Sequence, residues 1–199
     1  YQYGRNQISD TYDQNDMGFL RRNNQVVDNL SLSYTIFDPF WRLWNFSTGL
    51  TAEYSRLFNP RNFTGMVLGY NARALFDTRF FLNLRAGYHP LGRRDYFEPR
   101  VPGRYYKTDP EWNVSLGYSS DYRRRVYIDG SFSYARITSP FLQQHYEIDF
   151  RPTFRASDQL NIALGVNYRE GIDEVGYVRH VLPDTAYFGI RQTPTLTHS

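Results

Sequence analysis

Cysteine is absent from this chain of 199 residues, which excludes a disulfide framework, a thiolate metal site and a thiol nucleophile. Long apolar stretches are missing as well. No window holds the ~18 consecutive apolar residues of a membrane-spanning helix, so a transmembrane helix is excluded. The first residues contain no basic region followed by an apolar run, the pattern of a secretory signal peptide. A membrane protein is still compatible with these absences, because a β-barrel crosses lipid with half of its strand residues polar.

Lysine is almost absent too, since Lys107 is its single occurrence, and the positive charges are nearly all arginine. The 23 basic and 20 acidic residues nearly cancel and leave a net charge of +3. This balance excludes a dedicated nucleic-acid surface. Aromatic side chains, by contrast, are abundant and make up 18 % of the chain. The length suits one domain, which we expect to cover residues 1–199.

Apolar and polar residues alternate with a period of two along most of the chain. Between Trp44 and Tyr54, the even positions are Trp, Phe, Thr, Leu, Ala and Tyr, and the odd positions are Asn, Ser, Gly, Thr and Glu. Successive side chains of a strand point to opposite faces of a sheet, so this pattern predicts a strand with one apolar face. The same alternation predicts eight strands, at residues 29–36, 44–54, 64–76, 80–88, 112–119, 126–136, 146–155 and 160–169.

Charged residues collect on the polar face of these segments. They are Glu53, Arg73, Arg85, Asp129, Glu147, Asp149, Arg151, Arg155 and Arg169. Because 22 % of the chain is charged, we expect a face without charge to meet hydrocarbon or a core, while the other face meets water. The chain is therefore predicted to be all-β.

The connections between the predicted strands alternate in length. Short turns are expected at Asp38-Pro39, Asp77-Thr78, 121–125 and 157–159, and longer loops at 57–62, 89–110, 138–144 and 170–186. Tight turns at one edge and long loops at the other predict an up-and-down antiparallel meander. Two weaker strands, near residues 1–8 and 186–193, bring the number to ten. An even number of strands is compatible with a closed barrel.

Three features favour a transmembrane barrel over a soluble ligand-binding barrel, in which the apolar face would point inward. Aromatic residues bracket the apolar face, as Trp44 and Tyr54 do, like the girdles at two lipid–water interfaces. Each span has the about nine to eleven residues that a tilted strand needs to cross lipid. The polar face is rich in Gly, Ser and Asn, which suits a wet lumen. We predict an antiparallel up-and-down transmembrane β-barrel in a Gram-negative outer membrane, with outer-membrane lipid as its partner.

Two stretches carry a resemblance to a known family. They are the Asn15-Asp16-Met17-Gly18-Phe19 core of residues 12–24 and the closing Tyr187-Phe188-Gly189-Ile190-Arg191-Gln192-Thr193. Both resemble the C-terminal β-barrel of an uncharacterised bacteroidete outer-membrane family, whose members carry an N-terminal carbohydrate-binding module of the family-nine type. The resemblance implies that the chain is part of a longer protein, and it supplies no specific activity. Residues 196–199 lack the final aromatic residue usual in bacterial barrels, so we expect a fragment or a piece of a larger barrel.

Charges on the polar face form the first candidate site, which we name the lumen charge network. Its members are Glu147, Asp149, Arg151, Arg155, Asp129 and Arg169. Opposite charges in a lumen usually pair, because pairing offsets the cost of burying them. The alternative is a polar constriction that selects solutes. Both interpretations stay open from the sequence.

The long loop between His89 and Pro110 provides the second candidate site. Its possible ligand contacts are Arg93, Arg94, Tyr96, Phe97, Tyr105 and Tyr106. Aromatic rings beside guanidinium groups can hold a sugar or an anionic glycan. The same residues could instead pack as an ordinary loop cluster or anchor the loop at lipid headgroups.

The remaining candidates concern metal binding and catalysis. His89, His145, His180 and His198 lack metal-ligand spacing, so neither a metal nor another cofactor is expected. A hydrolase with a rim active site is one alternative, in which Ser139 would need His89 or His145 as its base. We expect an outer-membrane protein that binds or takes up surface glycans or solutes, or that anchors another envelope protein.

Overall fold

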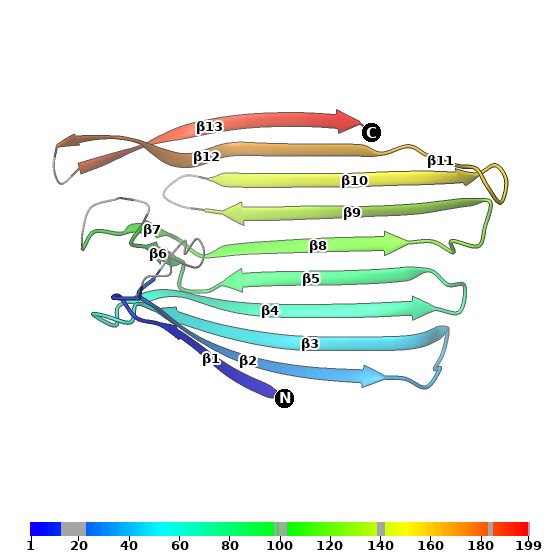
Figure 1. Cartoon of the computed structure of the whole chain (residues 1–199), viewed down its shortest axis with the longest axis horizontal. Coiled ribbons are helices and arrows are strands. Elements are labelled where there is room, and N and C mark those ends of the chain that lie inside the picture. Colours follow the sequence, from blue (N-terminus) through cyan, green and yellow to red (C-terminus); the bar gives the residue numbers. More distant parts are fainter. Residues whose placement is uncertain (13–22, 98, 100–102, 139–141, 183–184, 199) are drawn as a thin grey trace.

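The computed structural model describes residues 1–12, 23–97, 99, 103–138, 142–182 and 185–198, with the backbone alone beyond residue 172. These residues form one antiparallel sheet (Figure 1). In pairing order its strands are β1 (Gln2–Ile8), β2 (Gln25–Ile36), β3 (Leu43–Arg56), β4 (Phe63–Phe76), β5 (Phe81–His89), β8 (Glu111–Ser119), β9 (Val126–Ile137), β10 (Gln143–Arg155), β12 (Val166–Leu182) and β13 (Thr185–His198). Three short strands lie off this path, namely β6 (Arg93–Asp95), β7 (Tyr106–Thr108) and β11 (Asn161–Ala163).

The prediction of an all-β antiparallel meander is confirmed. The predicted segments and both weak terminal strands lie in strands of this sheet, each paired with its neighbour along the chain. The described residues include no helix, and thus none that is long and apolar enough to cross a membrane. The turns after β2, β4, β8 and β10 share one edge, right in Figure 1, which we call the short-turn edge. The opposite edge is the long-loop edge.

The long loop predicted at residues 170–186 is wrong. β12 continues to Leu182 and β13 begins at Thr185, with a register that runs from Val166 opposite His198 to Leu182 opposite Thr185. Bulges interrupt this register, the first between Gly171 and Glu174. Glycines and charges hide the alternation here, but strand pairing depends on backbone hydrogen bonds that do not require it.

A proline divides the eighth predicted strand, 160–169, into β11 and β12. Leu164 donates its backbone N–H to the carbonyl of Pro152 in β10 at 3.1 Å. Proline has no N–H to give in return, so the ladder is interrupted at this point. On either side the register is the same, with Thr153 opposite Ala163 and Phe150 opposite Val166.

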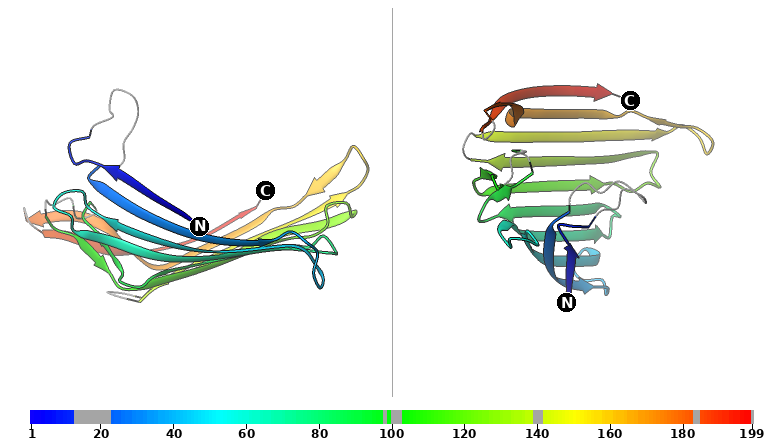
Figure 2. Two further views of the ribbon diagram at one scale, coloured as in Figure 1. Left: turned by 90° about the horizontal axis from the view of Figure 1, so that it is seen from below. Right: turned by 60° about the vertical axis from the view of Figure 1, so that its left-hand side comes forward.

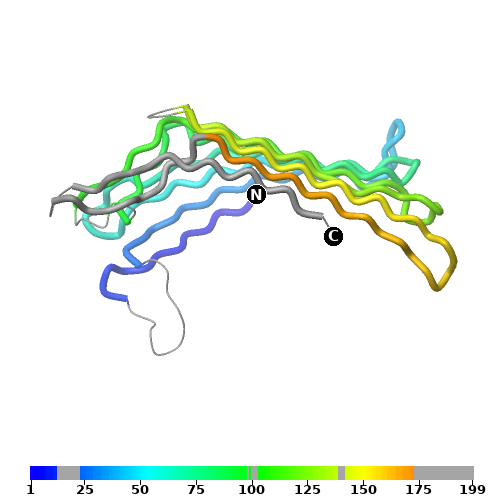
Figure 3. Tube along the Cα trace, turned by 90° about the horizontal axis from the view of Figure 1, so that it is seen from above, coloured from blue at the N-terminus to red at the C-terminus, as the bar shows by residue number. Residues whose placement is uncertain are grey.

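The sheet is open rather than closed into the predicted barrel. β1 and β13 stand at opposite ends of the pairing order, and each pairs with a single neighbour. Figure 2 shows these two strands at the two rims of a curved sheet, and Figure 3 shows the sheet from above as a trough. Side-chain alternation determines which face of each strand is apolar. Closure requires that the first and last strands pair through backbone hydrogen bonds in a fixed register, which alternation does not specify.

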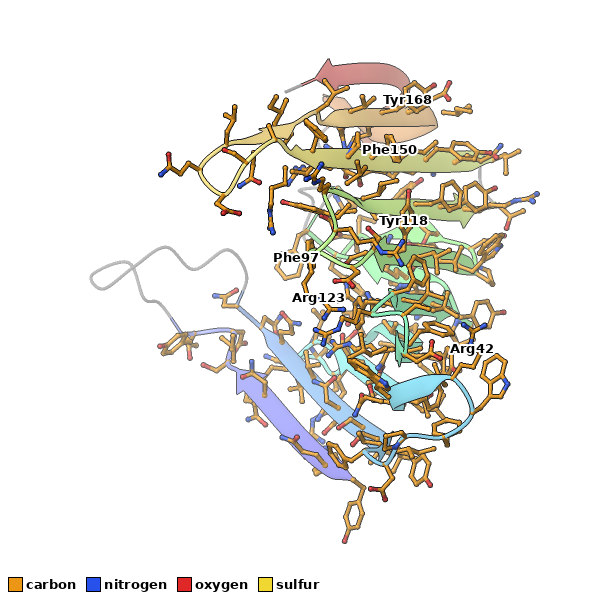
Figure 4. The ribbon with its side chains drawn as sticks, turned by 90° about the vertical axis from the view of Figure 1, so that its right-hand side faces the viewer. Arg42, Phe97, Tyr118, Arg123, Phe150 and Tyr168 are labelled. Atoms are coloured by element: carbon orange, nitrogen blue, oxygen red, sulfur yellow. The ribbon has the colours of Figure 1, made fainter. Side chains whose placement is uncertain are left out.

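The two faces of the trough differ in chemistry. Apart from the two register shifts at the ends of the β3–β4 pair, even-numbered residues of β2 to β10 share one face and odd-numbered residues share the other, as the cross-strand pairs Leu84–Leu116 and Arg85–Ser115 show. The odd-numbered face is concave; Phe97 of the loop that covers it lies on the concave side in Figure 4. The apolar, even-numbered face is therefore convex and outward.

The apolar face is largely uncovered. Leu50 is 55 % exposed and Leu116 is 39 % exposed, although both lie in mid-strand, and Val26 and Leu57 are the buried hydrophobic residues among the described side chains. The chain exposes 13809 Å², whereas a compact protein of 23.6 kDa would expose about 9,800 Å². The sheet by itself thus has almost no hydrophobic core.

Aromatic side chains form a band along each edge of the convex face. At the long-loop edge, Tyr134 lies 5.0 Å from Trp112 and 4.7 Å from Tyr146 between ring centroids. At the short-turn edge, Phe80 lies 6.0 Å from Phe76 and 6.4 Å from Tyr118. Leucine, alanine and valine are common between the two bands, where Tyr70 and Phe132 also lie, opposite Leu50 and Leu116.

Contrary to the expectation of a charge-free apolar face, five charged residues of the described strands lie on it, all toward the long-loop edge. They are Arg5, Asp28, Arg56, Arg136 and Glu170. β2, β3 and β12 extend further toward this edge than predicted, so three of these residues fall outside the predicted segments, and Arg136 is the last residue of its own. Asp28, Arg136 and Glu170 lie opposite Tyr54, Trp112 and Tyr146 of the aromatic band, Arg56 lies just beyond it, and the centre of the face remains uncharged.

A left-handed glycine begins the hairpin of β6 and β7. Gly92 has φ +65°, and a Cβ there would lie 1.9 Å from the carbonyl oxygen of Thr108. Only a residue without a side chain permits both this turn and the close approach of β7. Gly103, at the far end of the same hairpin, has φ +74° but no atom within 4 Å of a Cβ.

We expect Gly92→Ala to lower the free energy of unfolding by about 1–3 kcal/mol, because it adds backbone strain and a clash with the backbone of β7. Gly103→Ala is the matched control, since it adds strain without a clash and should cost less. Chemical denaturation of both variants measures the difference. Equal losses would mean that the approach to Thr108 does not constrain the hairpin.

Candidate functional site

The lumen charge network lies on three adjacent strands of the concave face. Cross-strand register places Glu147 of β10 opposite Arg169 of β12, and Arg151 of β10 opposite Asp129 of β9. Asp149 lies between them, opposite Ser131 and Asn167. All six members therefore share one polar surface, as the odd-numbered positions of neighbouring strands require.

Three contacts join members of this network to partners. Arg169 forms an ion pair with Glu147 through its Nη2 atom. At the short-turn edge, the Tyr122 hydroxyl donates to Asp129 at 2.7 Å, and Arg155 donates to the Tyr122 carbonyl at 3.2 Å. These contacts connect β9, β10 and β12 through side chains as well as through the backbone.

Asp149 and Arg151 have a different role in the described part of the chain, where neither forms an ion pair. Both line a hollow of about 360 Å³ near the short-turn edge, together with Asn83, Ser119 and Ser131. In this hollow the Asp149 carboxylate and the Arg151 guanidinium group are thus available to water or a solute.

The turn after β8 carries an ion pair within its own residues. The Asp121 carboxylate accepts hydrogen bonds from the backbone N–H of Arg123 at 3.0 Å and from its guanidinium group at 2.8 Å. These bonds hold the pKa of Asp121 far below its usual range, so this carboxylate stays ionised at any physiological pH. In Figure 4, Arg123 extends on the concave side of the sheet.

A second hollow lies at the long-loop edge, beneath the hairpin of β6 and β7. Its volume is about 440 Å³, which is within the range of small-molecule sites. The lining combines concave-face residues of β3, β4, β5, β9 and β10 with residues of the hairpin, among them Glu53, Val67, His89, Phe97 and Tyr106. We call it the loop cavity.

The loop cavity combines polar groups with aromatic surface and little net charge. Arg93, which lines it, is neutralised by Glu111 at 2.6 Å. Glu53 forms no ion pair among the described residues, and the Nδ1 atom of His89 is buried without a hydrogen-bond partner there. Burial raises the pKa of the Tyr106 hydroxyl, so this group stays protonated at neutral pH. A neutral, hydroxyl-rich ligand is the chemistry that these groups suit.

The predicted loop contacts separate into two groups. Arg93, Arg94, Phe97 and Tyr106 line the loop cavity. Tyr96 and Tyr105 do not line it but contact each other, with ring centroids 5.0 Å apart. The Arg94 guanidinium lies 5.2 Å from the ring centre of Tyr105 and 5.7 Å from that of Phe63. The loop is therefore both a cavity wall and an aromatic cluster.

Several lining residues of the cavity were not candidates from the sequence. Glu53, Thr64, Gln143 and Asn24 come from distant segments, and only the pairing of the strands brings them together. Among the described residues no three His, Asp or Glu side chains gather as a metal site. Ser139, the side chains of His180 and His198, and most of the 12–24 motif lie outside the described residues.

Comparison with known proteins identifies one family. The family described as Domain of unknown function (DUF5916) matches residues 1–199. No curated protein and no solved structure matches the chain.

We expect Arg169→Gln to lower the free energy of unfolding modestly, because it removes a half-exposed ion pair that water screens. Arg151→Gln removes the same charge from the same face but breaks no ion pair among the described residues, so it should cost less. Urea denaturation of both variants, with Glu147→Gln added to close a double-mutant cycle, measures the coupling. A larger loss for Arg151→Gln would contradict this assignment.

Proposed function

The chain belongs to the DUF5916 family, a family of unknown function, and we propose that it forms the wall of a transmembrane β-barrel in a bacterial outer membrane. In this proposal the barrel presents the loop cavity to the cell exterior, where it binds a surface glycan or a small polar solute. The observation that carries the proposal is the exposed apolar face between two aromatic bands.

The dimensions of the apolar face support this proposal. From Trp44 to Tyr54, the face of β3 covers about 33 Å along the strand. At the tilt of about 40° that is usual in membrane barrels, this length corresponds to about 25 Å across the bilayer, the height of a lipid-facing band. Tyrosine and tryptophan at the ends of such a band suit the two lipid–water interfaces.

The curvature of the sheet favours lipid over water as the surrounding of the apolar face. In a soluble ligand-binding barrel the apolar residues line the concave side. Here the concave side carries the lumen charge network, and the apolar residues lie on the convex side. A protein in water would leave this face exposed, at a cost of about 25 cal/mol for each Å² of apolar surface.

Closure of the barrel follows from the same proposal. Backbone groups along the free edges of β1 and β13 would lack partners in hydrocarbon, which only a closed sheet avoids. β1 runs toward the long-loop edge and β13 runs away from it, so the two edges can pair in antiparallel fashion with each other or with further strands. Both arrangements preserve the lumen and the loop cavity.

The composition of the loop cavity supports a sugar or a similar polar solute as its ligand. Carboxylates such as Glu53 accept hydrogen bonds from hydroxyl groups, and the half-exposed ring of Phe97 offers an apolar platform for the CH face of a sugar. Long loops of outer-membrane barrels face the exterior, which would place this cavity where glycans and nutrients arrive.

We expect Leu116→Arg to lower the free energy of unfolding in lipid vesicles by about 2–4 kcal/mol, because it places a charge near the middle of the apolar face. Ser131→Arg is the matched control, since Ser131 lies beside Gly117 on the concave face and opposite Asp149. Folding titrations into vesicles should show a loss for Leu116→Arg alone. Equal losses in both variants would refute the lipid-facing assignment.

The absence of cysteine allows a direct test of orientation with single-cysteine variants. Arg104→Cys, in the hairpin at the long-loop edge, should react with a membrane-impermeant maleimide on intact cells. Thr78→Cys, at the short-turn edge, should react only after the outer membrane is opened. The reverse labelling pattern would mean that the barrel has the opposite orientation.

A further inference from the structure

We propose that a hollow at the long-loop edge of the convex face binds the phosphate of a lipid headgroup. The hollow has a volume of about 470 Å³ and is lined by Gln7, Arg56, Phe58, Asn59, Pro60 and Arg61. It lies outside the loop cavity and the lumen charge network. This inference rests on the proposed membrane location.

The position of the hollow matches the depth of lipid phosphates. Arg56 follows Tyr54 by two residues on the same face of β3, so it lies about 6.6 Å further along the strand. The ring centroid of Tyr54 lies 5.8 Å from that of Phe63, and Tyr54 belongs to the aromatic band at this edge. Aromatic bands mark the headgroup level, so the next position outward meets phosphate.

The charge of the hollow is positive and largely unneutralised. Two of its lining residues are arginines and none is acidic. In the described part of the chain neither Arg56 nor Arg61 forms an ion pair. Asp28 interacts electrostatically with Arg56, but Arg5 already binds this carboxylate at 2.6 Å.

Hydrogen bonds hold the connection between β3 and β4 in place, so the hollow is formed before a ligand arrives. Asn24 donates to the Asn59 carbonyl at 2.8 Å, and Asn59 donates its backbone N–H to the Asn24 side chain at 2.8 Å. The Asn59 amide group also donates to Asp10 at 2.9 Å. Asp10 is therefore engaged by Asn59. Arg56 donates one N–H to the Leu57 carbonyl at 3.4 Å, which leaves its other N–H groups, Arg61 and Gln7 for a ligand.

This set of groups suits a phosphate that carries acyl chains. Guanidinium groups bind phosphate oxygens through paired, charge-assisted hydrogen bonds. Phe58 and Pro60 add apolar surface beside them, and the lipid-facing side of β3 continues directly from the hollow. A soluble phosphate would bind the arginines but would not contact the apolar surface of Phe58, Pro60 and β3.

The test measures lipid binding to the purified chain in a neutral detergent by native mass spectrometry. Wild-type protein should retain one molecule of dioleoyl phosphatidic acid, and Arg56→Gln/Arg61→Gln should weaken that binding at least tenfold. Arg124→Gln/Arg125→Gln removes the same charge at the short-turn edge and should leave the affinity unchanged. Gln7→Glu leaves both arginines in place and should weaken binding by adding a carboxylate, which keeps the inference testable if the double variant fails to fold.

Three outcomes would overturn the inference. One is equal affinity in the wild-type protein, in Arg56→Gln/Arg61→Gln and in Gln7→Glu. Another is binding of inorganic phosphate as tight as that of the lipid, which would identify a soluble phosphate as the ligand. Either of these two results leaves the membrane proposal intact, provided that Leu116→Arg impairs folding into vesicles and Ser131→Arg does not. The third outcome is equal folding of Leu116→Arg and Ser131→Arg into vesicles. In that case the membrane proposal fails, and the lipid assignment fails with it.

Discussion

An antiparallel sheet with one apolar face must cover that face, and nothing in the described part of this chain does so. Among residues 1–12, 23–97, 99, 103–138, 142–182 and 185–198, no helix and no second sheet packs on the convex side, and Leu50 and Leu116 are exposed in the middle of their strands. The gain from removing apolar surface from water is the main force in folding, so this sheet needs an apolar surrounding to be stable. Its aromatic bands, its central zone without charge and its polar concave side are all consistent with lipid as that surrounding.

The concave face uses its charges in two ways. Glu147 and Arg169 form an ion pair across β10 and β12, and such contacts strengthen the wall only modestly, because water reaches them. Asp149 and Arg151 instead line a hollow, where they are accessible to water and to solutes in the trough. A mixture of signs on one wall suits a hydrated surface better than a filter for ions of one charge.

The long-loop edge concentrates the features that could recognise a ligand. The loop cavity lies on its concave side, beneath a hairpin that depends on Gly92. The arginine-lined hollow lies on its convex side, beyond the aromatic band. The two sites differ in charge because their surroundings differ: Glu111 neutralises Arg93 at the cavity, whereas Arg56 and Arg61 lack such a partner among the described residues.

The sequence by itself determined the strands, their order and the chemistry of each face, since alternation with a period of two is a local property that each strand displays separately. It did not reveal β12 beyond residue 169, because glycines and charges break the alternation there while backbone pairing with β13 continues. Only the tertiary structure decided that the apolar face is convex, that Arg169 rather than Arg151 pairs with an acid, and that Glu53 and Phe97 share a cavity. These outcomes depend on the curvature of the sheet and on contacts between residues far apart in the chain, which no local pattern encodes.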